Sequence, residues 1–298
     1  MSTVKQKILI VDDEEIIRDL CARALKDYRI LQADNGQEAL KILDQQEVDL
    51  VLADIMMPVM GHTTLESIML QLPKVIGHRG AAAYAPENTL ESFREARRRG
   101  ATWVEIDVKL TADGVPIVMH DDSLKRTMGI DRLVASTPRA QLPPEVPTFE
   151  EAIACFAELG LGCNVEIKPC EGREAETARV TVETLRRCWP AHLPPPLLSS
   201  FKDASLVAAR DAAPEFARAI LIDDIQDNWR TRADAVGAVG VNTSGKRLTA
   251  PRAVEIRAAG HALSVYTIND GAIAKALVGM GVHCIITDAP DVILAALD

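Results

Sequence analysis

The most constraining feature of this sequence is a recurrence of short apolar segments, each followed by a segment whose apolar residues have helical spacing. From Lys74 onward there are eight such strand-like segments: residues 75–77, 104–109, 164–167, 197–201, 218–222, 239–242, 263–267 and 284–287. Eight βα repeats within roughly 225 residues are typical of a (β/α)₈ barrel. We therefore predict an α/β fold in which residues 73–298 form a TIM barrel.

A helix is predicted between the first two barrel strands. Asn88, followed three residues later by Glu91, predicts a capping box at its start, and Gly100 predicts its end. The two strands of a βαβ unit pair in parallel, so the end of the first strand meets the second strand. This pairing is expected to place His78 beside Glu105.

The second barrel strand carries two carboxylates on one face. Because side chains alternate along a strand, Glu105 and Asp107 point the same way. An Ala-Asp-Gly turn at residues 112–114 is typical of a hairpin, so the chain then runs back beside this strand. The return brings His120 to the acidic pair.

Further charged residues end the next strand and complete a candidate metal and phosphate site. Glu166 and Lys168 are two residues apart and share a face. Three carboxylates, Glu105, Asp107 and Glu166, form a hard-oxygen site that suits Ca²⁺ or Mg²⁺. Lys168 either compensates their charge or contacts phosphate, and the arrival of Arg79 at the same strand ends favours phosphate.

Several motifs, taken together and in order, resemble the glycerophosphodiester phosphodiesterase family. They are His78-Arg79-Gly80, Pro86-Glu87-Asn88-Thr89, Glu105-Ile106-Asp107-Val108, Asp113-Gly114, His120-Asp121 and Glu166-Ile167-Lys168. The resemblance runs from Lys74 to the C-terminus. It implies metal-dependent hydrolysis of glycerophosphodiesters to sn-glycerol 3-phosphate and an alcohol, with His78 and His120 as the general acid and base. Residues 123–146 are shorter than the insertion that is common in the family.

Residues 1–72 predict a smaller α/β unit ahead of the barrel. Three apolar strands, residues 7–11, 29–32 and 48–53, alternate with helical segments, which favours a parallel sheet covered on both faces. The carboxyl ends of the first and third strands bring together Asp12, Asp13 and Asp54. Ligands bind at this edge in open α/β sheets.

This unit resembles the first half of a response-regulator receiver domain, a flavodoxin-like fold. The resemblance implies that Asp54 is the phosphoacceptor and that Asp12 and Asp13 hold Mg²⁺. A third helix, residues 63–72, then leads directly into the first barrel strand, where a receiver would continue with two more strands. We therefore expect no competence for phosphorylation. Because an unpaired sheet edge tends to recruit another surface, we expect residues 1–72 to pack on the barrel, to pair with a second copy of the chain, or to be loosely folded. The receiver resemblance implies contact with a histidine kinase.

Composition narrows the classes of partner. A net charge of -10 and a pI near 5.2 argue against nucleic-acid binding, which needs a basic surface. No apolar run approaches the roughly 20 residues that span a bilayer. Six cysteines without a C-x-x-C pair indicate free thiols and a cytoplasmic location.

Two other functions stay open. One is a signalling or scaffold protein with an inactive barrel, and the other is a barrel phosphodiesterase for lysophospholipids or cyclic phosphodiesters. Phe201 and Trp229 are candidate wall residues for the glycerol or alcohol group of a substrate, although single aromatic residues more often belong to the core. Asp288 is a candidate helix N-cap as much as a catalytic group.

Overall fold

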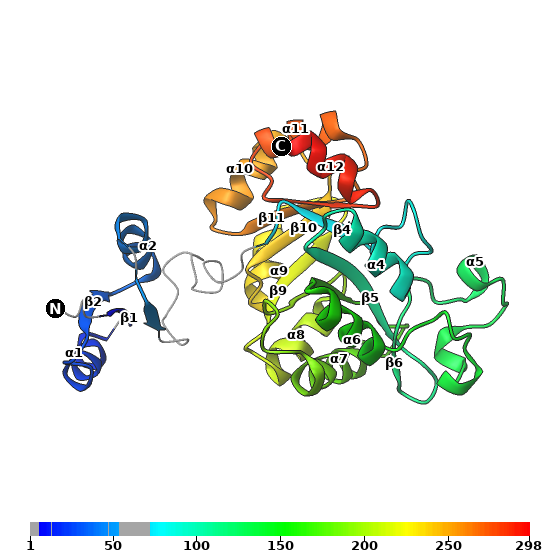
Figure 1. Ribbon diagram of the computed structural model, residues 1–298, viewed down its shortest axis with the longest axis horizontal. Coiled ribbons are helices and arrows are strands. Elements are labelled where there is room, and N and C mark those ends of the chain that lie inside the picture. The colour runs from blue at the N-terminus through cyan, green and yellow to red at the C-terminus, as the bar shows by residue number, and fades with distance from the viewer. Residues whose placement is uncertain (1–5, 13, 47, 54–71) are drawn as a thin grey trace. The chain divides into compact units, whose positions relative to one another are not determined.

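A computed structural model describes residues 6–12, 14–46, 48–53 and 72–298 (Figure 1). The chain divides into two compact units, Met1–Gln71 and Leu72–Asp298. Each unit has its own sheet and its own apolar core.

The N-terminal unit is built on a three-stranded parallel sheet, as predicted. Strand β1 (Lys7–Val11) lies between β2 (Arg29–Ala33) and β3 (Leu50–Ala53). Helices α1 (Glu15–Ala24) and α2 (Gly36–Gln45) lie on opposite sides of the sheet (Figure 1).

The prediction that this sheet is covered on both faces holds for the central strand and is wrong for the edge. Ile8 and Ile10 of β1 are buried, whereas their neighbours Leu50 and Leu52 in β3 are 50% and 37% exposed. The third helix that the sequence predicts, residues 63–72, lies outside the described residues except for its last residue. Helix α1 has no buried residue, and its Leu20 is largely exposed.

The second unit is a closed barrel of eight parallel strands, which confirms all eight predicted strands. The strands are β4 (Val75–His78), β5 (Trp103–Leu110), β7 (Gly162–Ile167), β8 (Leu197–Ser200), β9 (Ala217–Ile222), β10 (Gly240–Ser244), β11 (Ala262–Tyr266) and β12 (Cys284–Thr287). The sheet order runs from β4 through β12 and back to β5, and the pairing of β4 with β5 closes it.

Helices surround the strands of the barrel. They are α4 (Leu90–Arg98), α6 (Phe149–Leu159), α7 (Glu174–Cys188), α8 (Asp203–Ala212), α9 (Trp229–Val236), α10 (Ala250–Ala258), α11 (Gly271–Gly279) and α12 (Pro290–Leu297). Among the described residues, none of these helices combines the length and apolar character needed to cross a membrane. The six cysteines all lie in the described part of the chain, and all are free thiols.

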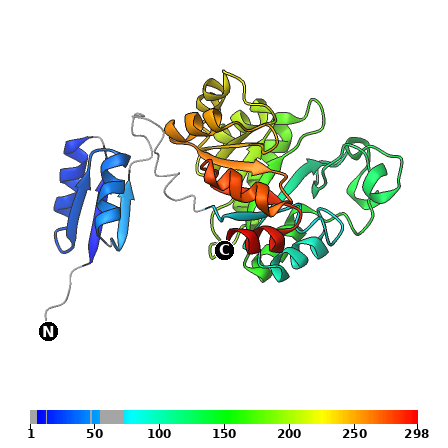
Figure 2. The ribbon, with the colours of Figure 1, turned by 90° about the horizontal axis from the view of Figure 1, so that it is seen from above.

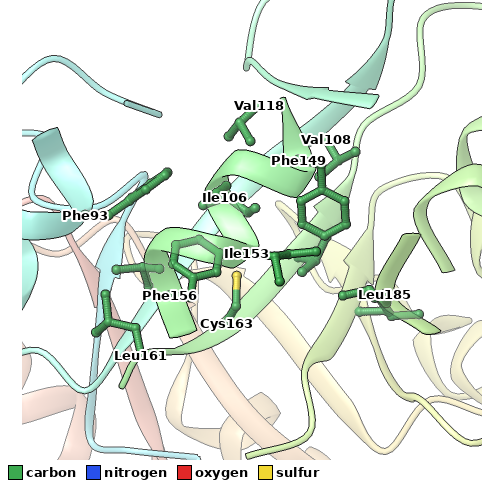
Figure 3. Close-up of a cluster of buried hydrophobic side chains, with 14 of the residues drawn as sticks. Phe93, Ile106, Val108, Val118, Phe149, Ile153, Phe156, Leu161, Cys163 and Leu185 are labelled. Atoms are coloured by element: carbon green, nitrogen blue, oxygen red, sulfur yellow. The ribbon is translucent and has the colours of Figure 1, made fainter. Parts of the chain in front are cut away.

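The main apolar core lies between the strands and the surrounding helices, not in the space that the strands enclose. In one cluster, Ile106 and Val108 of β5 pack toward Phe149 and Phe156 of α6 (Figure 3). The Phe156 ring meets Phe93 edge to face, with ring centroids 5.0 Å apart, a favoured aromatic geometry. Alternate residues of β5 therefore face the helices.

The other face of the strands points into the barrel, and on several strands it carries polar side chains. Glu105, Asp107, Asn164, Ser199 and Asn242 are all buried there. Every residue of β5 is buried as a result, and its sequence alternates between apolar and charged side chains. This alternation directs the chemistry of the chain to the inside of the barrel.

A hairpin adds an antiparallel strand to the outside of the barrel sheet, as the Ala-Asp-Gly turn predicts. Strand β6 (Pro116–Val118) pairs with β5, with Val118 opposite Val108. The segment that follows β6 projects from one side of the barrel in both views (Figures 1 and 2). It contains the short helix α5 (Lys125–Met128) and two 3₁₀ turns, Val134–Ser136 and Arg139–Gln141.

Candidate active site

Three carboxylates meet at the carboxyl ends of neighbouring strands. Glu105 and Asp107 lie on β5, Glu166 lies on β7, and Asp107 is in register with Glu166. One oxygen from each of the three side chains falls within 4.8 Å of the others, and all three residues are buried. Parallel pairing of two strands with the same alternation is sufficient to assemble this trio.

His78 joins the trio from the adjacent strand. The register of β4 and β5 places His78 opposite Glu105, as predicted, with 3.9 Å between His78 Nε2 and Glu105 Oε2. Its Nδ1 atom is 2.6 Å from Asp288 Oδ1, and Asn269 donates to the other oxygen of Asp288. The ring is therefore held through Nδ1, and Nε2 is turned toward the carboxylates.

His120 reaches the same cavity from the end of the hairpin arm. The backbone N–H of Met119 donates to the carbonyl of Asp107, which fixes the arm beside β5. His120 Nδ1 lies 2.6 Å from Asp121 Oδ1. Each of the two histidines thus has a carboxylate on Nδ1, and Nε2 is left for a substrate.

Two positively charged side chains, Arg79 and Lys168, border the carboxylates. Arg79 donates from its backbone N–H to Glu105 and from Nη1 to Glu87, and its Nε atom lies 3.3 Å from Asp107 Oδ2. Lys168 Nζ lies 2.8 Å from Glu166 Oε1 and 3.5 Å from Asp107 Oδ1. The two cations approach Asp107 through different oxygens, so the carboxylate is held between them.

Burial and charge separate the pKa values of the three acids. Burial, with the nearby charge of Asp107, raises the pKa of Glu105 to about 7 and that of Glu166 to about 8. Burial also favours a higher pKa for Asp107, but Lys168 and Arg79 outweigh it and hold that pKa below its usual range. With Arg79 and Lys168 as the neighbouring cationic side chains, both glutamates titrate close to neutral pH, whereas Asp107 stays ionised.

The two imidazoles shift in opposite directions. Burial lowers the pKa of His78, but the hydrogen bond with Asp288 and the charge of Glu105 outweigh it, so the pKa lies above its usual value. Burial lowers the pKa of His120 in spite of Asp107 and Asp121. Opposite shifts in two neighbouring titratable groups are typical of acid and base pairs.

The donor set fits a divalent cation. Carboxylate oxygens are the ligands that Ca²⁺ and Mg²⁺ prefer. The raised pKa values of Glu105 and Glu166 show that their ionised forms require more positive charge than Arg79 and Lys168 supply. A cation among Glu105, Asp107 and Glu166 would supply that charge, so the residues present match a metal site.

A cavity of about 160 Å³ opens onto this cluster. Its walls include both histidines, both cations, the floor residues Asn164 and Ser199, and the aromatic residues Phe201 and Tyr266. An adjoining cavity of about 500 Å³ shares His120, Glu166, Lys168 and Phe201 with it. The arrangement can hold a small anionic group in the first cavity and a larger group in the second.

The structure brings together every residue that the sequence predicts for the barrel site: His78, Arg79, Glu105, Asp107, His120, Glu166 and Lys168. Of the predicted receiver site, Asp13 and Asp54 lie outside the described residues. Asp12 is buried in the N-terminal unit, where its side chain accepts a hydrogen bond from the backbone N–H of Glu14.

The prediction that Asn88 caps the first helix of the barrel is wrong. Helix α4 is capped by Thr89, which forms a capping box with Ser92. Asn88 has instead a left-handed backbone (φ 58°) and donates to Asp107 Oδ2 at 2.8 Å. Because the Asn88 side chain is hydrogen-bonded to Asp107, it does not cap the helix and is instead part of the site.

For Trp229 and Asp288 the structure decides between the two alternatives that the sequence left open. Trp229 is buried in the barrel core, with its indole N–H bonded to Glu255, so it lines no substrate wall. Asp288 is not the N-cap of α12, which is Ala289, and is the partner of His78. Phe201 does line the cavity and so takes the wall position, not the core position.

Sequence reasoning assigned no role to Glu87 and did not single out Arg126. Arg126 Nη1 and Nη2 donate to Glu87, and Arg126 Nε and Nη2 donate to Asp121. Glu87 belongs to the Pro-Glu-Asn-Thr motif, so its place in that motif could have identified it as a site residue. No local pattern marks Arg126.

Comparison with known proteins agrees with this site. Residues 78–292 match the glycerophosphoryl diester phosphodiesterase family, and residues 8–77 match the response regulator receiver domain. A glycerophosphodiester phosphodiesterase of Bacillus subtilis (strain 168) is 30% identical over 250 residues, which are 72% of this chain and 83% of the relative.

Solved structures show the same barrel. A phosphodiesterase of Oleispira antarctica in complex with the product sn-glycerol-3-phosphate superposes with a TM-score of 0.74 at 38% identity, over 76% of this chain and 97% of that chain. A glycerophosphodiester phosphodiesterase of Thermotoga maritima gives a TM-score of 0.64 at 26% identity, over 76% and 98%. The chain therefore belongs to the glycerophosphoryl diester phosphodiesterase family, with a segment related to response-regulator receivers ahead of the barrel.

Proposed function

We propose that this protein hydrolyses glycerophosphodiesters to sn-glycerol 3-phosphate and an alcohol. One observation carries the proposal: three buried carboxylates, two carboxylate-bound imidazoles and two cations converge on a single cavity. Hydrolysis of a phosphodiester needs a divalent cation or its equivalent, charge stabilisation at the phosphoryl group, and proton transfer on both sides of it. The cluster contains groups suited to each of these tasks.

Glu105, Asp107 and Glu166 are the proposed ligands of a Ca²⁺ or Mg²⁺ ion. Bound there, the ion supplies Lewis-acid polarisation of a phosphate oxygen. Arg79 and Lys168 border the same cavity and orient the phosphoryl group through hydrogen bonds from charged donors. Asn88 keeps Asp107 in place by donating to one of its oxygens.

His78 and His120 are the proposed proton-transfer groups. One imidazole accepts the proton of the attacking hydroxyl or water, and the other donates a proton to the departing alkoxide. Because Asp288 and Asp121 occupy the Nδ1 atoms, both transfers take place at Nε2. Fixed rings keep these atoms directed at the phosphoryl group.

The sizes of the two cavities support the assignment of the substrate halves. The cavity of about 160 Å³ has the size for a glycerol phosphate group beside the carboxylates. The adjoining cavity of about 500 Å³ takes the alcohol. The solved relative from Oleispira antarctica was crystallised with sn-glycerol-3-phosphate, which is the product expected here.

A coupled assay tests the proposal. Purified protein should release glycerol 3-phosphate from glycerophosphocholine, EDTA should abolish the release, and Mg²⁺ or Ca²⁺ should restore it. His120→Ala should lower kcat by roughly 10²- to 10⁴-fold without a change in melting temperature. His192→Ala is the matched control, because His192 is exposed and lines neither cavity. Full activity of His120→Ala would refute the assignment, and no release from any glycerophosphodiester would favour a scaffold role.

We further propose that the N-terminal receiver-like segment is not a phosphorylation switch. Support comes from the sequence, in which the chain enters β4 of the barrel at the place where a receiver would begin its fourth strand. The chain of residues 72–298 should have the same kcat/KM as the full chain, with and without acetyl phosphate. A rate that changes on incubation of the full chain with acetyl phosphate contradicts this proposal.

A further inference from the structure

Arg126 of α5 bridges two carboxylates beside the candidate active site. Its Nε and Nη2 atoms lie 2.6 and 3.0 Å from the two oxygens of Asp121. Its Nη1 and Nη2 atoms lie 2.8 and 2.7 Å from the two oxygens of Glu87. One guanidinium thus forms four hydrogen bonds in two forked pairs, an arrangement that a planar guanidinium allows and an ammonium does not.

Each of these carboxylates holds a different member of the site. Asp121 Oδ1 is the partner of His120 Nδ1 at 2.6 Å. Glu87 Oε1 accepts from Arg79 Nη1 at 2.7 Å. A continuous series of charged hydrogen bonds therefore runs from the imidazole through Asp121, Arg126 and Glu87 to Arg79.

The two ends of this series come from separate parts of the fold. His120 stands at the end of the β6 arm, and Arg79 stands in the turn after β4. Among the described residues, the only ion pairs of Arg126 are those with Glu87 and Asp121. Without the guanidinium, two carboxylates would face each other and each would lose a pair of hydrogen bonds.

We propose that Arg126 is a positioning residue that sets His120 and Arg79 in a fixed mutual orientation, so that proton transfer and phosphoryl binding occur at one substrate pose. The inference rests on the proposed phosphodiesterase function and adds a residue to it. Arg126 touches neither cavity and acts through Asp121 and Glu87. Its hydrogen bond is also the first cause of the pKa of Asp121 lying well below its usual range, which keeps that carboxylate ionised beside the imidazole.

Stability and activity should respond differently to loss of Arg126. Its side chain is 49% exposed, and exposed ion pairs contribute little to folding. Loss of an outer partner of a site typically lowers activity roughly 10- to 100-fold. Arg186 offers a matched control. It is 48% exposed and forms a forked pair with Glu215, and neither residue lines either cavity.

The experiment measures steady-state kinetics on glycerophosphocholine with saturating Mg²⁺, together with thermal melting, for full-length variants. Arg126→Gln should lower kcat/KM roughly 10- to 100-fold while melting as Arg186→Gln does, and Arg186→Gln should keep the wild-type rate. Arg126→Lys should recover only part of the loss, because an ammonium cannot form both forks.

Single and combined variants separate positioning from general destabilisation. Asp121→Asn should act chiefly on kcat and Glu87→Gln chiefly on KM, whereas Arg126→Gln should act on both. When Arg126→Gln is added to the Asp121→Asn, Glu87→Gln double variant, it should cause little further loss, because residues in one network are not additive.

Two results overturn the inference. One is Arg126→Gln with wild-type kcat and KM, and the other is a loss that follows the melting temperature and multiplies independently with Asp121→Asn and Glu87→Gln. Wild-type protein that releases no glycerol 3-phosphate overturns the proposed function itself, which is a different outcome from an active wild type with an active Arg126→Gln.

Discussion

At the scale of single residues, the site depends on side chains that hold other side chains. Asp288 accepts from Asn269 through Oδ2 and fixes His78 through Oδ1, and Asn88 donates to Asp107. None of these residues needs to touch the substrate. Buried polar groups of this kind restrict their neighbours to one orientation, and proton transfer depends on that orientation.

Replacement of Asp288 by Asn tests this dependence. The amide removes the negative charge and offers an N–H toward His78, so the imidazole loses its fixed tautomer. We expect kcat for glycerophosphocholine to fall roughly 10²- to 10⁴-fold. Asp291→Asn serves as the control, because Asp291 pairs with Arg99 away from the cavity. A kcat within about threefold of the wild type for Asp288→Asn would be inconsistent with this role, since general acid and base effects are far larger.

At the scale of elements, the turn between β4 and α4 determines where Arg79 stands. Arg79 and Gly80 both have left-handed backbone conformations, with φ of 50° and 89°. A Cβ atom on Gly80 would lie 2.4 Å from Ser92 Oγ and 2.6 Å from the Ser92 carbonyl carbon, at the start of α4. Close contact between the turn and the helix therefore requires glycine at this position.

Comparison of Gly80→Ala with Gly114→Ala separates the cost of the left-handed backbone from the cost of steric overlap. Gly114 has φ of 77° with no atom within 4 Å of the new Cβ, so its substitution should cost only the backbone conformation, about 1 kcal/mol. Gly80→Ala should cost about 1–3 kcal/mol more, because the methyl group overlaps Ser92. Urea unfolding of both variants measures the difference, and equal free energies of unfolding would show that the turn can move away from α4.

At the scale of the whole barrel, the buried acids make stability depend on pH and on metal. In the folded protein without metal, burial raises the pKa of Glu105 to about 7 and that of Glu166 to about 8. Both values lie above those of the unfolded chain. Between the unfolded and folded pKa values the folded state binds more protons, so the free energy of unfolding falls as pH rises. The raised pKa of His78 acts in the same direction, and the lowered pKa of His120 acts in the opposite direction below its usual value.

We therefore expect the melting temperature of the barrel in EDTA to fall between pH 5.5 and pH 8.5, within the range in which these acids titrate. Added Mg²⁺ or Ca²⁺ should reduce this dependence, because a bound cation stabilises the ionised carboxylates. Glu166→Gln should show a shallower fall in EDTA, since one titrating acid is gone. A melting temperature that rises over this interval in EDTA would show that other groups dominate the pH dependence.

The sequence by itself determined the strands of the barrel and the seven predicted site residues. Buried strands have short apolar runs, and alternation within β5 separates Ile106 from Glu105 and Asp107 whatever the rest of the chain does. The register of adjacent parallel strands then brings His78 to Glu105 and Glu166 to Asp107. Local chemistry is sufficient for these contacts because each depends on neighbouring strands only.

Only the tertiary structure decided which side chains hold the site residues in place. Asp288 is 210 residues from His78 in the chain, and Arg126 is 39 residues from Glu87. The first contact exists because β12, the last strand, pairs with β4, the first strand of the barrel. The second exists because the segment after β6 folds back toward the turn after β4. Closure depends on the registers of all eight strands together and on the packing of an irregular segment, and no short stretch of sequence contains that information.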